Sequence, residues 1–157
     1  MPPTAQTAPP LDITAIPRPA RSEALLAALK SRVVIADGAM GTMLQDVNPT
    51  LDDFQQHEGC NEILNVTRPD IVETIHGTYL ETGIDAVETN TFGANWSNLS
   101  DYGIQDRIEE LARAGAEIAR RAVEQFEARD NRMRWVLGSM GPGTKLPSLG
   151  HLSLIHI

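Results

Sequence analysis

Three short apolar runs, at residues 33–37, 84–90 and 134–139, alternate along the chain with two segments of helical periodicity. Short runs of this kind, bounded by glycine or polar residues, are typical of strands buried inside a parallel sheet. Because the helices between them span about 12 residues or more, consecutive strands must lie parallel and be joined by right-handed crossovers. The order β-α-β-α-β therefore predicts an α/β fold. Three strands make an incomplete sheet, so we expect the sequence to be part of something larger.

Local signals place the helices. A TRPD sequence at residues 67–70 combines a capping hydroxyl, an early proline and an acidic residue, and Gly83 suits the end of the helix that follows. Residues 104–126 carry apolar side chains on one face and predict the longest helix. A shorter amphipathic helix is expected at residues 23–30 and one helical turn at residues 40–46. No regular structure is predicted for the segment between that turn and residue 67.

Charge and cysteine content argue against several classes of function. The 157 residues carry a net charge of −8, which disfavours nucleic acid or an anionic membrane as the main partner. No apolar stretch approaches the roughly 18 residues of a membrane span. Residues 1–20 lack the features of a secretory signal and are expected to form a disordered leader. Cys60 is the only cysteine, so no intrachain disulfide can form and the reducing cytoplasm is the expected location.

Each of the three predicted strands ends in polar or glycine-rich residues. The first ends in DG at residues 37–38, the second in TNT at 89–91, and the third in the loop 138–150. The carboxyl ends of parallel strands converge on one crevice, where α/β proteins place their ligand sites. A carboxylate, hydroxyls, an amide and backbone donors predict a site for a small molecule with both an amine and a carboxylate. The alternative is that Asp37 only caps the segment that follows.

Three other patterns do not support a site. Residues 138–145 resemble a phosphate-binding loop, but Thr and Lys are in reversed order and Pro147 prevents the helix that such a loop requires. His57 and Cys60 have the spacing of two metal ligands, whereas zinc needs three or four. His76 falls within a predicted helix and is expected to be partly buried and hydrogen-bonded. The residues also do not assemble a nucleophilic triad.

Four motifs occur in the order and spacing of a known family: VIADGAMGTM at 34–43, GCNE at 59–62, VETNTFG at 87–93 and GSMGP at 138–142. Together they resemble the homocysteine-binding domain of the homocysteine S-methyltransferase family, in particular its cobalamin-dependent branch, the methionine synthases. The resemblance covers about residues 33–151. It implies a (β/α)8 TIM barrel, of which residues 21–151 would hold roughly the first three β/α units.

The resemblance also implies a reaction. In the family, a methyl group passes to the sulfur of homocysteine to give methionine, and a zinc ion held by three cysteines on later strands activates the thiol. Cys60 corresponds to a loop position and not to a zinc ligand, so no catalytic or metal-binding residue is assigned here. The methyl donor, methylcobalamin charged from methyltetrahydrofolate, would act through folate and cobalamin modules outside this sequence. The isolated chain is therefore expected to be inactive.

Recognition of the amino acid is what the matching motifs imply for this chain. By resemblance, Asp37 lies near the amino group of homocysteine, and the backbone of Gly38 together with Thr89 holds its carboxylate. Asn90 and Gly141 are expected to line the same crevice.

The residues alone do not separate three alternatives. These are a non-catalytic amino-acid-binding fragment, a barrel completed by a partner, and a betaine-type relative of the same family, which shares the Asp-Gly strand end. The fuller match of the DGxMGT and ETNTF motifs favours the cobalamin-dependent branch. Residues 152–157 depart from the family pattern, and are interpreted either as an artefactual end or as a native edge strand.

Overall fold

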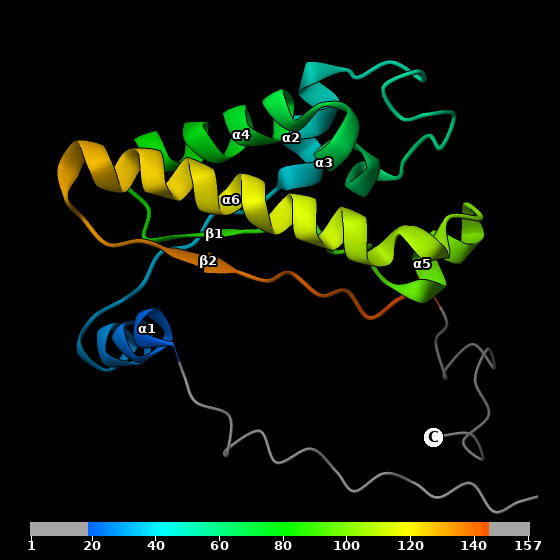
Figure 1. Cartoon of the computed structure of the whole chain (residues 1–157). Coiled ribbons are helices and arrows are strands. Elements are labelled where there is room, and N and C mark those ends of the chain that lie inside the picture. The colour runs from blue at the N-terminus through cyan, green and yellow to red at the C-terminus, as the bar shows by residue number, and fades with distance from the viewer. Residues whose placement is uncertain (1–18, 145–157) are drawn as a thin grey trace, which may run out of the picture. The chain divides into compact units, whose positions relative to one another are not determined.

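The computed structural model describes residues 19–144 (Figure 1), which belong to two compact units divided after Val33. The described part of the first unit contains one helix, α1 (Ala20–Ser31). The helix predicted at residues 23–30 is therefore present, but none of its residues is buried, and Leu29 is 55 % exposed. Ala20, the last residue of the range expected to form a leader, is the first residue of this helix. Residues 1–18 lie outside the described range.

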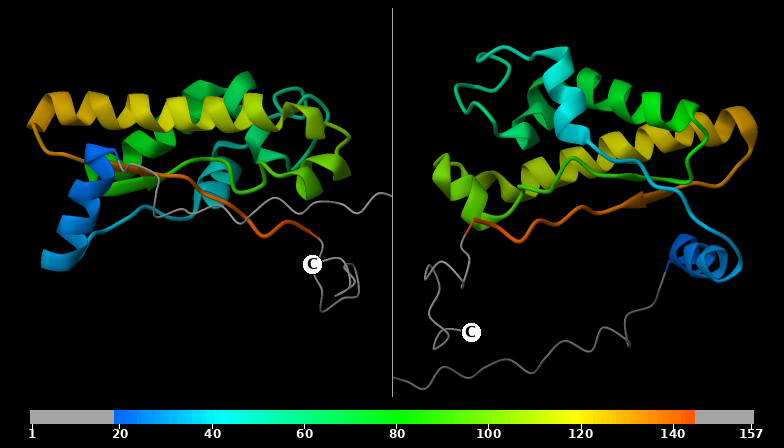
Figure 2. Two further views of the ribbon diagram at one scale, coloured as in Figure 1. Left: turned by 60° about the horizontal axis from the view of Figure 1, so that its bottom comes forward. Right: turned by 180° about the vertical axis from the view of Figure 1, so that it is seen from behind.

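The second unit is helix-rich and contains a small parallel sheet, which confirms the predicted α/β class (Figure 2). Its two long helices, α4 (Pro69–Glu81) and α6 (Ile108–Asp130), pack against each other and lie on the same side of strands β1 (Ala86–Glu88) and β2 (Trp135–Leu137). The shorter helical segments are α2 (Met40–Val47), η2 (Asn61–Ile63), α3 (Leu64–Thr67), α5 (Trp96–Asp101) and η3 (Gln105–Arg107).

The sheet has the predicted parallel pairing but fewer residues than expected. β1 and β2 pair in parallel with Ala86 opposite Trp135. The run at residues 33–37 adjoins β1 only through a single parallel bridge between Ala36 and Ala86, so the prediction of a full strand there is wrong. It is also not buried on both faces, because the described residues leave the Ile35 side chain 56 % exposed.

The ends of α4 follow the local signals in part. Pro69 is the first helical residue, where its missing N–H costs no hydrogen bond. Gly83 has φ +84° and directly follows the C-cap residue Thr82, as predicted for a glycine that ends a helix. Thr67 does not cap α4. Its hydroxyl instead donates to the carbonyl of Ile63 within the preceding turn, at 3.2 Å.

Other boundaries differ from the periodicity. α6 begins at Ile108, because residues 105–107 form the 3₁₀ turn η3, and it continues to Asp130, beyond the predicted end at 126. The segment without predicted structure contains η2 and most of α3. The one turn expected at residues 40–46 is the helix α2.

The core is formed where the helices pack on one another and on β1. One cluster joins α2, α3, α4 and α6, a second joins α4, α6 and β1, and a third joins η2, α5 and the start of α6. Burial of these apolar side chains is the main stabilising contribution to such a fold. The fully buried large side chains include Leu44, Ile63, Leu64, Ile75, Leu80, Leu99 and Leu111.

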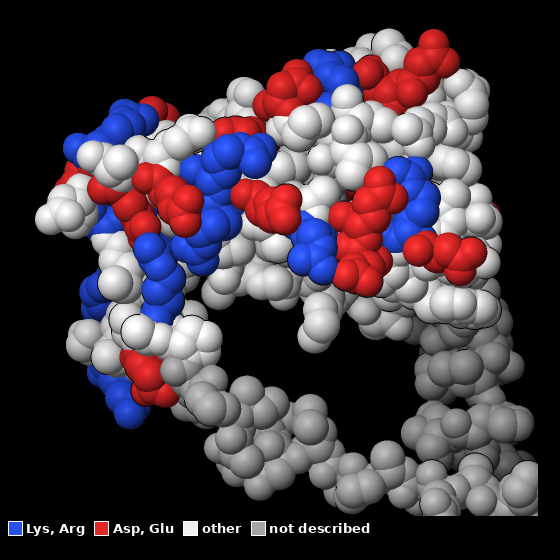
Figure 3. Space-filling model, viewed as in Figure 1, with Lys and Arg blue, Asp and Glu red and all other residues white. Residues whose placement is uncertain are grey.

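Figure 3 shows positive and negative side chains interspersed over the face that includes α6. Arg121 of α6 pairs with Glu73 of α4 at 2.8 Å, and Arg129 pairs with Glu81 at 2.7 Å. Partly exposed pairs of this kind contribute little to stability, but they link the two long helices along their length. None of the helices in the described part of the chain is long and apolar enough to span a membrane.

Candidate functional site

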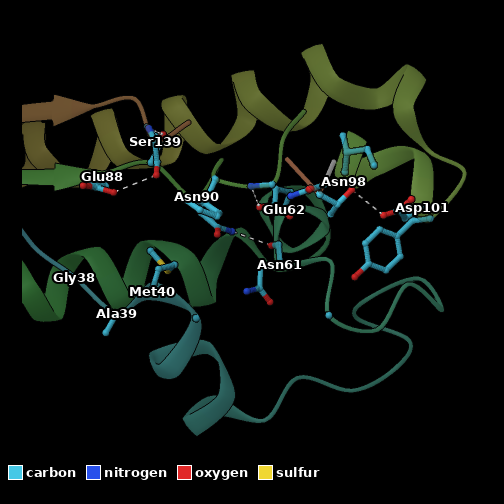
Figure 4. A pocket seen from close by; sticks show the side chains of 18 of the residues that line it. Gly38, Ala39, Met40, Asn61, Glu62, Glu88, Asn90, Asn98, Asp101 and Ser139 are labelled. Carbon is cyan, nitrogen blue, oxygen red and sulfur yellow. Dashed lines mark hydrogen bonds between the residues drawn. The ribbon is translucent and has the colours of Figure 1, made fainter. Parts of the chain in front are cut away.

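A hollow of about 560 Å³ opens at the carboxyl ends of β1 and β2, and we call it the strand-end pocket (Figure 4). Four of the five predicted site residues line it, namely Asp37, Gly38, Thr89 and Asn90. The first two follow the Ala36 bridge and the other two follow β1, so the parallel arrangement brings them together. The lining is completed by Ala39, Met40, Gly41, Gly59, Asn61, Glu62, Glu88, Phe92, Gly93, Asn98, Leu99, Asp101, Tyr102, Ser139 and Thr144.

The Asp37 side chain is hydrogen-bonded to the carboxyl end of β1 and does not cap a helix. Its Oδ1 accepts the backbone N–H of Glu88 at 2.8 Å, and its side chain is only 4 % exposed. The N-cap residue of the following helix α2 is Ala39, which receives no side-chain cap hydrogen bond. The alternative in which Asp37 only caps the next segment is therefore wrong. A buried carboxylate in a pocket is suited to binding an ammonium group.

The hydroxyl of Thr89 is part of a short network that joins the ends of the two strands. Thr89 Oγ1 lies 2.6 Å from Thr91 Oγ1 and accepts the backbone N–H of Ser139 at 3.0 Å. Since the Thr91 hydroxyl donates to the Ser139 carbonyl at 2.7 Å, the Thr89 hydroxyl proton points to Thr91. The backbone N–H of Thr89 donates to Leu137. To donate to a ligand carboxylate, Thr89 would have to exchange one of these bonds.

Asn90 and Gly141 occupy different positions relative to the pocket. The Asn90 amide donates to the Asn61 carbonyl and to Asn65 Oδ1, both at 2.9 Å, and so ties the end of β1 to η2 and α3. Gly141 is not among the residues that line the pocket. Its N–H donates to the carbonyl of Phe92 at 2.9 Å, and a Cβ at this position would lie 2.5 Å from the same oxygen. Gly141 therefore permits the close approach of the β2 loop to the β1 loop.

The structure adds acidic residues that the sequence motifs did not assign to the site. Glu62, Glu88 and Asp101 line the pocket together with Asp37, and none of its described lining residues is Lys or Arg. Glu62 is 7 % exposed, and its Oε1 accepts the Gly93 N–H at 2.7 Å (Figure 4). The GCNE motif that contains Glu62 was the signal available in the sequence. This excess of carboxylates favours a ligand that carries a positive charge.

Cys60 is a buried thiol beside the pocket. It is 1 % exposed, and burial, together with the charge of Glu62, raises the pKa of its thiol from 9.0 to about 11. Its Sγ lies 3.8 Å from Glu62 Oε2. A metal ligand or nucleophile needs a thiolate, which this environment disfavours.

We expect Cys60 in the folded chain to react with iodoacetamide, at about pH 8, about 100-fold more slowly than in the urea-unfolded chain. Between pH 9.0 and about 11, the thiol keeps its proton in the folded chain but loses it in the unfolded chain. Stability should therefore be retained below pH 9.0 and fall as the pH rises towards about 11. Mass spectrometry of the alkylated chain measures the rate directly, since Cys60 is the single cysteine. Equal rates in the two states would show that the thiol is not buried.

The described residues do not fit a zinc ion. Across residues 19–144, no three His, Cys, Asp or Glu side chains come together in a way that could hold a metal. His57 makes an edge contact with the Tyr102 ring, and Cys60 is buried and protonated. No metal-dependent step is therefore assigned to these residues.

The loop that resembles a phosphate site is described only to Thr144, whose hydroxyl lies 2.7 Å from that of Ser97.

His76 differs from its prediction. It lies in α4 as expected, but it is 0 % exposed and not partly buried. Within the described part of the chain, neither of its ring nitrogens has a hydrogen-bond partner. Its Nδ1 lies 3.8 Å from Asp37 Oδ2, which is beyond hydrogen-bond distance.

The fold defines an α/β protein with an acidic pocket at the carboxyl ends of its parallel strands. The model of the family described as homocysteine S-methyltransferase matches residues 34–156, a range that includes 152–156 of the segment expected to depart from the family. The chain therefore belongs to the homocysteine S-methyltransferase family, which confirms the resemblance found in the four motifs. Residues 145–157 lie outside the described structure.

Individual relatives agree with this assignment. The chain is 63 % identical over 127 residues to methionine synthase of Mycobacterium tuberculosis and 61 % identical to that of Mycobacterium leprae. Each alignment covers 81 % of this chain, but only 11 % and 10 % of the relative, so the chain spans about a tenth of their length. Among solved structures, the metallated homocysteine methyltransferase MmuM of Escherichia coli matches 75 % of this chain and 41 % of its own, at 25 % identity and a TM-score of 0.61.

Proposed function

We propose that the chain is the amino-terminal part of the homocysteine-binding barrel of a cobalamin-dependent methionine synthase, and that its strand-end pocket binds homocysteine. The observation that carries this proposal is the acidic pocket around Asp37, at the strand ends of a chain that belongs to this family. The high identity to two methionine synthases favours the cobalamin-dependent branch over a betaine-type relative. In this proposal the described β/α units are roughly the first three of a (β/α)8 barrel.

Each proposed contact uses chemistry that the residue has available. Asp37 would bind the ammonium group of homocysteine, since within residues 19–144 its buried carboxylate accepts one backbone N–H, on Oδ1. Apart from its two chain neighbours, no described residue would lie within 4 Å of a Cβ added at Gly38, so the backbone there leaves room for a carboxylate to approach. Thr89 would complete the carboxylate site by exchanging its bond to Thr91. Asn90 and Gly141 would support this arrangement by fixing the loops around it.

The chemistry of methyl transfer is proposed to lie with other modules of the full-length protein. Zinc would lower the pKa of the substrate thiol, and cobalamin charged from methyltetrahydrofolate would supply the methyl group. The described residues do not assemble a zinc site, so the remaining barrel strands and the folate and cobalamin modules are the proposed partners. Neither nucleic acid nor a membrane is proposed as a partner. A cytoplasmic location is proposed from the single, reduced Cys60.

We expect the 157-residue chain on its own to form no methionine above background from homocysteine and methylcobalamin, with or without added zinc. The reason is that residues 19–144 assemble no set of three metal ligands, and the single cysteine is held protonated. Chromatographic detection of methionine provides the measurement. Zinc-dependent formation of methionine by the isolated chain would contradict the proposal that methyl transfer requires other modules of the full-length protein.

Calorimetric titration of the chain with L-homocysteine tests the proposed binding function. We expect one molecule to bind per chain in the presence of a metal chelator, since the proposed contacts are to the amino-acid end and not to sulfur. L-Methionine, which has the same amino-acid end, should also bind. The absence of heat with both ligands would overturn the proposal.

A further inference from the structure

His76 occupies an unusual position behind the strand-end pocket. It lies in α4 among the buried core side chains, with no exposed surface. Among the described residues, both ring nitrogens lack a hydrogen-bond partner. Leaving buried polar atoms unpaired costs free energy, and an apolar residue at this place in α4 would avoid that cost. An unpaired histidine at this place therefore points to a role beyond packing.

The carboxylate that His76 faces is that of Asp37. The Oδ2 atom of Asp37 lies 3.8 Å from Nδ1 of His76, and both side chains are almost fully buried, at 4 % and 0 % exposure. The other nearby carboxylate, Glu73 on the preceding turn of α4, is already engaged by α6. It accepts hydrogen bonds from Arg121 at 2.9 Å and from Gln125 at 2.7 Å. Of these two carboxylates, Asp37 is therefore the one available to accept a hydrogen bond from His76.

We propose that His76 is a positioning residue for amine recognition: when the substrate ammonium binds Asp37, the Nδ1–H of His76 donates to Asp37 Oδ2 and fixes the carboxylate from behind. This inference rests on the proposed function. Oδ1 is already anchored by the Glu88 N–H, so a second donor on Oδ2 would define the plane of the carboxylate. The gap needs to close by only roughly 1 Å, and such bonds are often long without ligand and shorten in the complex.

The test compares two ligands that differ only in the amino group, L-homocysteine and 4-mercaptobutanoate. For His76→Leu, we expect the affinity for L-homocysteine to fall about tenfold, the usual effect of losing a hydrogen bond to a charged group. The affinity for 4-mercaptobutanoate should stay within about twofold, because that ligand has no ammonium for Asp37 to hold. His76→Asn, whose amide N–H can take the place of Nδ1, should restore most of the loss.

A core variant on the same helix provides the matched control. Val72→Ala removes packing from a residue with 0 % exposure, and it should change the affinity for the two ligands equally or not at all. Equal losses of both ligands with His76→Leu, or no loss of either, would overturn the positioning role while leaving the proposed function intact. If the unaltered chain binds neither L-homocysteine nor L-methionine, the proposed function fails, and the inference about His76 fails with it.

A second measurement needs no variant and so does not depend on the folding of one. In the ¹⁵N NMR spectrum of the unaltered chain, the Nδ1 signal of His76 should move when L-homocysteine binds, and move much less with 4-mercaptobutanoate. A signal that is unchanged by bound L-homocysteine would contradict the proposal.

Discussion

Replacement of Asp37 by alanine is expected to weaken the binding of L-homocysteine about 10- to 100-fold, as measured by calorimetric titration. The carboxylate is almost fully buried, so in the proposed complex its charge-assisted hydrogen bond to the ligand ammonium would meet little competition from water. Within a full-length methionine synthase, the same change should appear as a strongly raised KM for homocysteine.

Two further variants make the Asp37 experiment specific. Asp37→Asn keeps the shape and the acceptor for the Glu88 N–H but removes the charge, so it should lose most of the same affinity. Asp46→Ala removes an exposed acid of α2 that does not line the pocket, and it should bind as the unaltered chain does. If Asp37→Ala bound L-homocysteine normally, Asp37 would be a structural residue only.

Two helical glycines are expected to respond in opposite ways to alanine. Gly115, in α6, lies against the network behind the pocket: a Cβ there would be 2.8 Å from Asn65 Nδ2 and 2.8 Å from Thr91 Cγ2. The Asn65 amide donates to the carbonyls of Asn90 at 2.8 Å and Leu111 at 3.0 Å, so it cannot move without breaking buried bonds. Gly115→Ala should lower the free energy of unfolding by about 2 kcal/mol.

Gly77→Ala in α4 is the matched control. Among the described residues, a Cβ at Gly77 would meet Phe126 alone, at the ordinary contact distance of 3.9 Å. The greater helix propensity of alanine should then raise the free energy of unfolding by about 0.5–1 kcal/mol. Urea denaturation followed by circular dichroism measures both changes. Stabilisation by both substitutions would mean that α6 does not pack closely on Asn65.

The order of elements and the place of the pocket in the fold could be predicted, because the signals for both are local in the sequence. The helical periodicity of α4 and α6 and the signals at Pro69 and Gly83 are encoded within a few residues. Parallel pairing follows from the length of the crossover helices. Since parallel strands end at one edge, Asp37 and Thr89 could be assigned to one site from their places in the sequence.

The features that were not predicted depend on contacts between distant residues. Glu62 is positioned in the pocket because its carboxylate accepts a hydrogen bond from the N–H of Gly93, 31 positions away. The apolar pattern at residues 33–37 predicts a strand, but only Ala36 bridges to β1 in the described structure. The burial of His76 could not be predicted from its neighbours in the sequence. Its position next to Asp37 arises only when α4 packs against β1.

The central claim is that the strand-end pocket binds the amino-acid end of homocysteine, and amide NMR of the chain titrated with L-homocysteine tests it most directly. The predicted result is a saturable change in the backbone signals of Gly38, Thr89 and Asn90, with little change in α1. No change at these three residues, or changes confined to the exposed side of α6, would contradict it.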